Sequence, residues 1–228
     1  MKLEVKNLSK KFNNIFAVNN ISFNTFHKIS ITCNNISFII NKNSTMGLLG
    51  PNGCGKTTSI GMMLGLISPS EGEILINGVK INTSNNIEIL SKLNFASSYI
   101  EVPKKLTVKQ NLEVYARLYG VKNLNQRIGE VSEDLNISQF LNKKNGELSS
   151  GQKNRVSLAK SFINKPKILF LDEPTASLDP DLGDFVREYI EKYKSNNELT
   201  ILLASHNMSE VERLCDNIIM MKEGSVVD

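Results

Sequence analysis

A glycine-rich stretch near residue 50 constrains the fold of this chain more than any other feature. It matches the pattern G-x-x-x-x-G-K-[ST], in which successive backbone N–H groups turn inward to cradle phosphate oxygens and side chains would block the approach. The pattern predicts that Lys56 reaches the β- and γ-phosphates of a nucleotide and that the Thr57 hydroxyl contacts Mg²⁺. The predicted phosphate-binding residues are Gly50, Pro51, Asn52, Gly53, Cys54, Gly55, Lys56, Thr57 and Thr58.

A second informative stretch is the apolar run Ile168-Leu-Phe-Leu171, which ends in the adjacent carboxylates Asp172 and Glu173. Continuous apolar runs of this length are typical of buried parallel strands. We expect Asp172 to help hold the metal, and Glu173 to polarise a water as general base because it directly follows the metal carboxylate.

The order of these motifs resembles that of the nucleotide-binding subunit of ABC transporters. Between them lies Leu148-Ser-Ser-Gly151-Gln152, which looks like the signature of that family. After Glu173, the stretch Ala176-Ser-Leu-Asp179 looks like its D-loop, and Ser205-His206 looks like its switch histidine. The resemblance covers nearly the whole chain. It implies an ATPase with ATP and Mg²⁺ as cofactors, in which Glu173, His206 and Lys56 carry the catalysis.

In that family the signature binds the γ-phosphate of ATP held on the opposite subunit. The resemblance therefore assigns Ser149, Gly151 and Gln152 to nucleotide binding across a head-to-tail dimer, formed with a second copy or with a homologous cassette. The turn opens a helix, whose N–H groups and positive dipole end favour an anion. Ser150 stands where the family has a glycine, and it would add strain if the position required a positive φ.

One further position departs from the family pattern, and another has two candidates. Ser98 falls where the family has a glutamine that touches Mg²⁺, and we expect the shorter hydroxyl to reach the metal through a water. Phe12 has the spacing of the aromatic residue that stacks on adenine in the family. Because residues 19–23 recur identically as residues 34–38, His27 has the same spacing to the second copy and is the alternative.

The alternation of strand and helix patterns around the phosphate loop predicts an α/β fold with a parallel sheet. The resemblance implies a P-loop NTPase core with a mostly parallel sheet, an N-terminal antiparallel β subdomain and an inserted helical subdomain at about residues 100–160. With 228 residues, the chain is long enough for one ample domain and short for two. We therefore expect a single ABC ATPase domain over residues 1–228.

Composition limits the partners. The net charge of +4 is too mild to argue for nucleic acid, and none is expected. No stretch approaches the roughly 18 uninterrupted apolar residues of a membrane span. The resemblance thus implies a peripheral protein at the cytoplasmic face of the cell membrane, attached through a transmembrane permease subunit.

The stretch over residues 106–120 looks like exporters of the ABC-2 type, so export is the expected direction of transport. Two alternatives stay open. A degenerate regulatory cassette would bind ATP without turning it over. A soluble ABC ATPase acting on ribosomes or DNA is disfavoured, because such proteins carry a second phosphate loop or long coiled coils that this sequence lacks.

Overall fold

The structure is a computed structural model that describes residues 1–13, 29–81, 87–98, 100–176 and 178–227, with side chains omitted at 13 and 29–34. The first copy of the repeated segment, the alternative adenine residue His27, and Ser177 of the D-loop lie outside the described residues. The second copy lies within a strand, in the register of an antiparallel sheet.

The larger of two sheets has the strand order β10-β9-β3-β8-β7-β6, and every neighbouring pair except β10–β9 is parallel. This confirms the predicted mostly parallel sheet. Because β3, β8 and β7 are neighbours, their carboxyl ends meet at one edge, where ligands of open α/β sheets bind. The strands are β3 (Thr45–Leu49), β6 (Leu93–Ser97), β7 (Ile168–Asp172), β8 (Thr200–Ser205), β9 (Asn217–Lys222) and β10 (Ser225–Val227).

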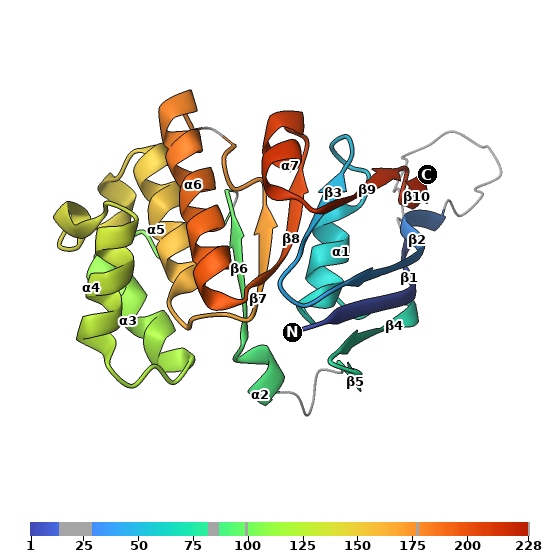
Figure 1. Cartoon of the computed structure of the whole chain (residues 1–228), viewed down its shortest axis with the longest axis horizontal. Coiled ribbons are helices and arrows are strands. Elements are labelled where there is room, and N and C mark those ends of the chain that lie inside the picture. The colour runs from blue at the N-terminus through green and yellow to red at the C-terminus, as the bar shows by residue number, and fades with distance from the viewer. Residues whose placement is uncertain (14–28, 82–86, 99, 177, 228) are drawn as a thin grey trace, which may run out of the picture.

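The smaller sheet is antiparallel, with the order β2-β1-β4-β5, and confirms the expected N-terminal β subdomain. Figure 1 shows it on the right, with α1 between it and the parallel sheet. Its strands are β1 (Leu3–Asn13), β2 (Ile29–Ile40), β4 (Glu71–Ile76) and β5 (Val79–Lys80).

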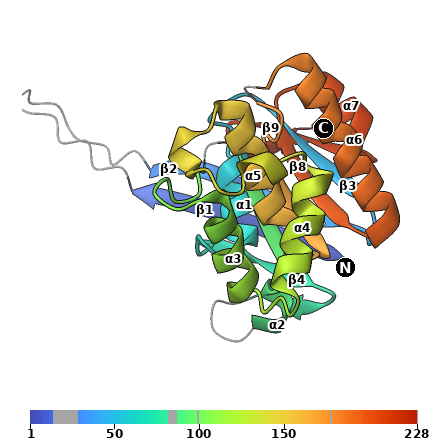
Figure 2. The ribbon, with the colours of Figure 1, turned by 90° about the vertical axis from the view of Figure 1, so that its left-hand side faces the viewer.

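Seven α-helices connect these strands in the described part of the chain. Figures 1 and 2 show α3, α4, α5 and α6 gathered on the side of the parallel sheet opposite α1. The helices are α1 (Lys56–Met63), α2 (Ile87–Leu90), α3 (Val108–Leu118), α4 (Leu124–Asp134), α5 (Ser150–Phe162), α6 (Pro180–Asn197) and α7 (Met208–Leu214). Helices α3 and α4 fall in the range expected for the helical subdomain. The division into domains stays a prediction.

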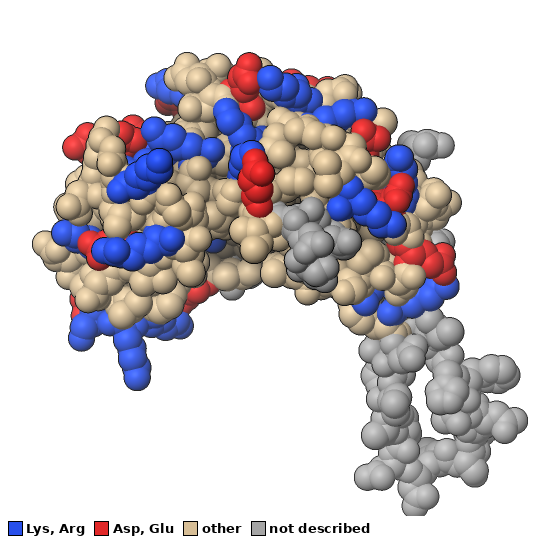
Figure 3. Space-filling view, turned by 90° about the horizontal axis from the view of Figure 1, so that it is seen from below, with Lys and Arg blue, Asp and Glu red and all other residues tan. Residues whose placement is uncertain are grey.

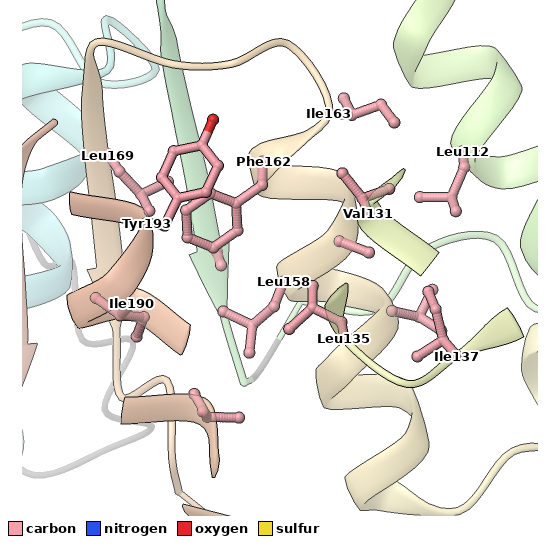
Figure 4. Packing of buried hydrophobic residues seen from close by; sticks show 14 of the residues in the cluster. Leu112, Val131, Leu135, Ile137, Leu158, Phe162, Ile163, Leu169, Ile190 and Tyr193 are labelled. Atoms are coloured by element: carbon pink, nitrogen blue, oxygen red, sulfur yellow. The ribbon is translucent and has the colours of Figure 1, made fainter. Parts of the chain in front are cut away.

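Strand β7 is buried on both faces, which explains why its sequence is apolar throughout. Ile168 and Phe170 pack in one core cluster with α1 and the antiparallel sheet, whereas Leu169 and Leu171 pack in another with α3 to α6. In the second cluster, Phe162 of α5 lies against Tyr193 of α6, with ring centroids 4.5 Å apart (Figure 4). The two clusters hold the carboxyl end of β7 rigidly between the layers.

No helix within the described ranges combines the length and the hydrophobicity needed to cross a bilayer. Lysine and arginine side chains are spread over the face shown in Figure 3, with carboxylates among them.

Candidate nucleotide site

The phosphate loop joins β3 to α1 and adopts a backbone that few residues other than glycine tolerate. Gly53 and Gly55 have φ of 81° and 108°. Gly50 is required for a different reason, because a Cβ there would lie 2.3 Å from the carbonyl oxygen of Met221 in β9. The loop is therefore shaped by conformation at two glycines and by close backbone approach at the third.

The loop and the start of α1 form one wall of a cavity whose other wall is the end of β7. The first N–H groups and the positive dipole end of a helix attract phosphate. Of the nine residues predicted to bind phosphate, six line this cavity, together with both carboxylates. The lining residues are Asn52, Gly53, Gly55, Lys56, Thr57, Thr58, Asp172 and Glu173.

The Lys56 side chain curls over the loop that precedes it. Its Nζ donates to the carbonyl oxygens of Gly50 at 2.6 Å and Pro51 at 3.2 Å. The residue is 6% exposed, so a nearly desolvated cation lies at the mouth of an anion-binding loop. Phosphate oxygens are the natural counter-charge for such a group.

Thr57 and Asp172 come together from α1 and β7. The Thr57 hydroxyl donates to Asp172 Oδ2 at 2.9 Å. Burial raises the pKa of the Asp172 carboxyl, and the hydrogen bond from Thr57 opposes that rise. A hydroxyl beside a carboxylate is a hard-oxygen donor pair of the kind Mg²⁺ prefers, and a cation there would reverse the effect of burial. The residues present fit a magnesium site.

Glu173 is buried, with 4% of its surface exposed, and its backbone is left-handed at φ 54°. Its N–H donates to the carbonyl of Ala204 in β8 at 2.8 Å. His206, directly after β8 and 56% exposed at its side chain, places Nδ1 2.7 Å from Glu173 Oε2. Among the described residues, Glu173 Oε1 is buried without a hydrogen-bond partner. Buried oxygens without a hydrogen-bond partner are rare in folded proteins. A role in accepting a hydrogen bond from a water explains why Glu173 Oε1 has no partner in the chain.

Ser98 lies behind Glu173 and does not line the phosphate cavity. Its hydroxyl donates to the Glu173 carbonyl and accepts from Asn154 Nδ2 at 3.1 Å. Asn154, from α5, also donates to the carbonyl of Pro174 at 3.0 Å. Ser98 thus contacts the backbone of Glu173, and its place among the metal ligands stays a prediction.

The signature residues lie at the exposed N-terminus of α5. Ser149 caps the helix: its N–H donates to Gln152 Oε1 at 3.0 Å, and its hydroxyl accepts from Gln152 N at 3.3 Å. Ser150 is helical and is not among the positive-φ residues, so a hydroxyl here adds no backbone strain. A Cβ on Gly151 would lie 3.0 Å from Leu182 of α6. None of the four lines the phosphate cavity of its own chain.

Phe12 lies near the end of β1, 38% exposed, with Lys10 Nζ 5.1 Å from its ring centroid. It is not part of the lining of the phosphate cavity. The contact with adenine stays a prediction.

Two residues near the site had no role in the sequence interpretation. Asn154 carried no signal, because its partners, the Ser98 hydroxyl and the carbonyl of Pro174, are distant in sequence. Glu210 completes an Asn-x-x-Glu pattern with Asn207, which is typical of a helix start. Its carboxylate instead accepts from the hydroxyls of Ser205 and Thr175. Ser205 directly precedes His206, and Thr175 follows Glu173 by two residues.

Fold and site together define a nucleotide-binding protein with a phosphate loop. The family model for ABC transporters matches residues 33–176. The ABC transporter ATP-binding protein NatA of Bacillus subtilis is 32% identical over 203 residues, which cover 88% of this chain and 82% of NatA. The Nod factor export ATP-binding protein I of Rhizobium johnstonii is 35% identical over 197 residues, covering 85% of this chain and 62% of that protein. The chain belongs to the ABC transporter family and is an ATP-binding cassette with ATPase activity.

Solved structures agree with this fold. The dimeric bacterial ABC transporter cassette MJ0796 superposes with a TM-score of 0.86 at 24% identity, over 99% of this chain and 97% of that one. The protein cbiO1 of Clostridium perfringens, part of the ABC transporter complex cbiONQ, gives a TM-score of 0.78 at 25% identity, over 99% and 86% of the two chains.

Proposed function

We propose that the chain is the ATP-hydrolysing subunit of an ABC exporter, working as a dimer on the cytoplasmic face of a membrane. The observation that carries the catalytic part is that Thr57, Asp172 and Glu173 line one cavity and that His206 contacts Glu173. Thr57 and Asp172 offer oxygens for a metal, and Glu173 with His206 offers a base held by a partner.

In this proposal the loop N–H groups and Lys56 hold the β- and γ-phosphates. Thr57 and Asp172 would hold Mg²⁺, which would supply charge neutralisation at the phosphate oxygens. Glu173 Oε1 takes a proton from a water whose oxygen bonds to the γ-phosphorus, while the bond from that phosphorus to the bridging oxygen breaks and ADP leaves. His206 keeps Glu173 oriented through Oε2 and donates toward the γ-phosphate.

The dimer is supported by the position of the signature. Ser149, Gly151 and Gln152 lie at a helix N-terminus away from the cavity of their own chain, so a second cassette is needed to bring them to ATP. Both MJ0796 structures similar to this chain are described as dimeric.

Export through a transmembrane permease is supported by the Nod factor export relatives, which are 32% to 35% identical. The segment that looked like ABC-2 exporters forms helix α3, and Val114 and Leu118 on that helix are exposed. A permease partner would account for a peripheral location at the cytoplasmic face.

The test is to tag the chain in its native cell, isolate the membrane protein that co-purifies, and measure Mg²⁺-dependent ATP hydrolysis of the complex. We expect steady turnover that Lys56→Ala abolishes, and transport of substrate out of the cytoplasmic compartment. A complex that binds ATP but never hydrolyses it would favour the regulatory alternative. Co-purification with ribosomes instead of a membrane protein would favour the soluble one.

A further inference from the structure

We propose that Glu210 is a positioning residue for ATP hydrolysis, which fixes the two segments that carry Glu173 and His206. The inference rests on the proposed catalytic roles of these two residues. Glu210 itself lines neither the phosphate cavity nor any surface on which ATP could lie, and only 1% of it is exposed.

The geometry of the Glu210 carboxylate is that of a bridge. Oε2 accepts from the Ser205 hydroxyl at 2.6 Å, and Oε1 accepts from the Thr175 hydroxyl at 2.7 Å. Ser205 directly precedes His206, and Thr175 is two residues after Glu173. One carboxylate thus ties the end of β8 to the loop that follows β7.

The turn around His206 is closed by further hydrogen bonds from the same residues. Asn207 N donates to the Ser205 hydroxyl at 3.0 Å, and Glu210 N donates to Asn207 Oδ1 at 3.4 Å. Ser205 Oγ therefore donates to Glu210 and accepts from Asn207, which leaves the chain little freedom at His206.

On the other side, Glu173 is held in a left-handed conformation, at φ 54°, that non-glycine residues adopt only at a cost. Such a conformation persists when surrounding contacts fix it. The N–H of Glu173 is held by Ala204 and its carbonyl by Ser98. The hydrogen bond from Thr175 to Glu210 attaches the same segment at a third point, two residues after Glu173.

A role in stability alone accounts poorly for this carboxylate. Burial raises the pKa of Glu210, against the hydrogen bonds from Ser205 and Thr175 and the charge of Arg187. Replacing buried charged groups with apolar ones is often neutral or stabilising, so a buried carboxylate is weak evidence for a contribution to stability. Two hydroxyl partners on two different segments are what a positioning role requires.

The experiment compares Glu210→Gln with the matched control Glu212→Gln, an exposed residue on the same helix. A glutamine replaces one of the two carboxylate oxygens with an NH₂ group, so only one of the two hydroxyls keeps an acceptor at its present place. We expect kcat to fall about 10- to 100-fold, because small misplacements of catalytic groups cost rates of that order. The Kd of ATP stays within twofold and the circular dichroism spectrum is unchanged. The control keeps wild-type kcat.

Ser205→Ala and Thr175→Val each remove one end of the bridge and serve if Glu210→Gln does not fold. We expect each to lower kcat with ATP affinity unchanged. A wild-type kcat in Glu210→Gln, or a lower melting temperature with kcat per folded molecule unchanged, overturns the inference. Full activity in Glu173→Gln overturns the proposed hydrolysis site first, so the two failures are distinguishable.

Discussion

Glu173 and Ser149 are both proposed to act on ATP, yet the fold treats them in opposite ways. Glu173 is buried and is attached through its N–H, its carbonyl and its side chain to three residues from two other segments of the chain. Ser149 is exposed, and its hydrogen bonds return to its own helix through Gln152. Contacts within one chain fix the position of the Glu173 carboxylate, whereas the signature is the exposed N-terminus of a helix that can contact a second chain.

Asn154 connects the two regions. It lies on α5, behind the signature, and it donates to Ser98 and to the carbonyl of Pro174, next to Glu173. A shift of α5 caused by ATP in the partner's site would therefore reach the backbone of Glu173. We therefore expect substitution of Glu173 to cause the largest loss of ATP hydrolysis. Substitution of Ser149 should act only across the dimer, and substitution of the linking residue Asn154 or of its partner Ser98 should cause smaller losses.

The largest effect is expected for Glu173→Gln. The amide keeps the size of the side chain but has no basic oxygen for the proton of the attacking water, so turnover falls roughly 10²–10⁴-fold. ATP still binds, and an ATP-loaded dimer accumulates that size-exclusion chromatography detects. Wild-type turnover in the purified variant would show that Glu173 is not the base.

The second prediction concerns the signature. Ser149→Arg and Lys56→Ala should each be inactive alone, because in the homodimer of either variant both sites lack one of their two halves. In a mixture, heterodimers contain one intact site, built from Lys56 of one chain and Ser149 of the other. Random mixing returns at most about a quarter of wild-type activity.

The control for this mixing experiment is Ser138→Arg, which places an arginine at another exposed serine. We expect that variant to hydrolyse ATP normally. If Ser149→Arg were as active by itself as Ser138→Arg, the signature would not act across the dimer.

The third prediction separates the two residues of the link. Asn154→Ala leaves the buried carbonyl of Pro174 without its donor, which costs about 1–3 kcal/mol, and it frees α5 from the loop. We expect about a tenfold loss of ATP hydrolysis. Ser98→Ala removes one hydroxyl whose neighbours keep other partners, and we expect a severalfold loss at most.

The measurement is steady-state ATP hydrolysis with Mg²⁺ and the membrane partner present. A collapse of activity in Ser98→Ala, with Asn154→Ala near wild type, would contradict this ranking. It would show that the Ser98 hydroxyl acts on the metal more directly than its contacts in the structure indicate.

Much of the fold followed from the sequence, because its signals are local. The phosphate loop, the apolar run of β7 and the helix after the signature are each encoded in consecutive residues. Within the range expected for the helical subdomain, about residues 100–160, α3, α4 and two short 3-10 turns precede α5. The capped start of α3 at Thr107 was visible in its Thr-x-x-Gln pattern, but the loop between α4 and α5 has no such signal.

The residues that support the site could not be predicted, for a physical reason. Asn154 hydrogen-bonds to groups 20 and 56 residues away, and Glu210, besides Ser205, to a hydroxyl 35 residues away; no periodicity reports such partners. The family pattern gave the position of Ser98 in the sequence but not the direction in which its hydroxyl points. Its hydroxyl faces the backbone of Glu173 because the end of β6 lies beside β7.

The last prediction concerns stability and not turnover, and it tests how tightly the signature helix α5 packs against the sheet. Lys160 of α5 donates to the carbonyl of Phe95 in β6 at 2.7 Å, and burial lowers its pKa to about 8. An unfolded lysine titrates near 10.4, so between these values the unfolded state binds more protons and stability rises with pH. The gain amounts to about 1–3 kcal/mol in the unfolding free energy of wild type relative to Lys160→Met, between pH 8 and 10.

Below pH 8 both states of Lys160 are protonated, and the difference between wild type and Lys160→Met is constant. Urea unfolding at pH 7, 8, 9 and 10 measures it, with Lys192→Met as the control, because Lys192 is exposed and its loss leaves the difference nearly flat. A difference that does not change with pH would show that the Lys160 ammonium stays hydrated in the folded protein, and one that falls with pH would show that the fold stabilises the charge. Helix α5 would then pack less tightly against the parallel sheet than the hydrogen bond of Lys160 to Phe95 indicates, in contrast to Glu173, which is fixed in the turn after β7.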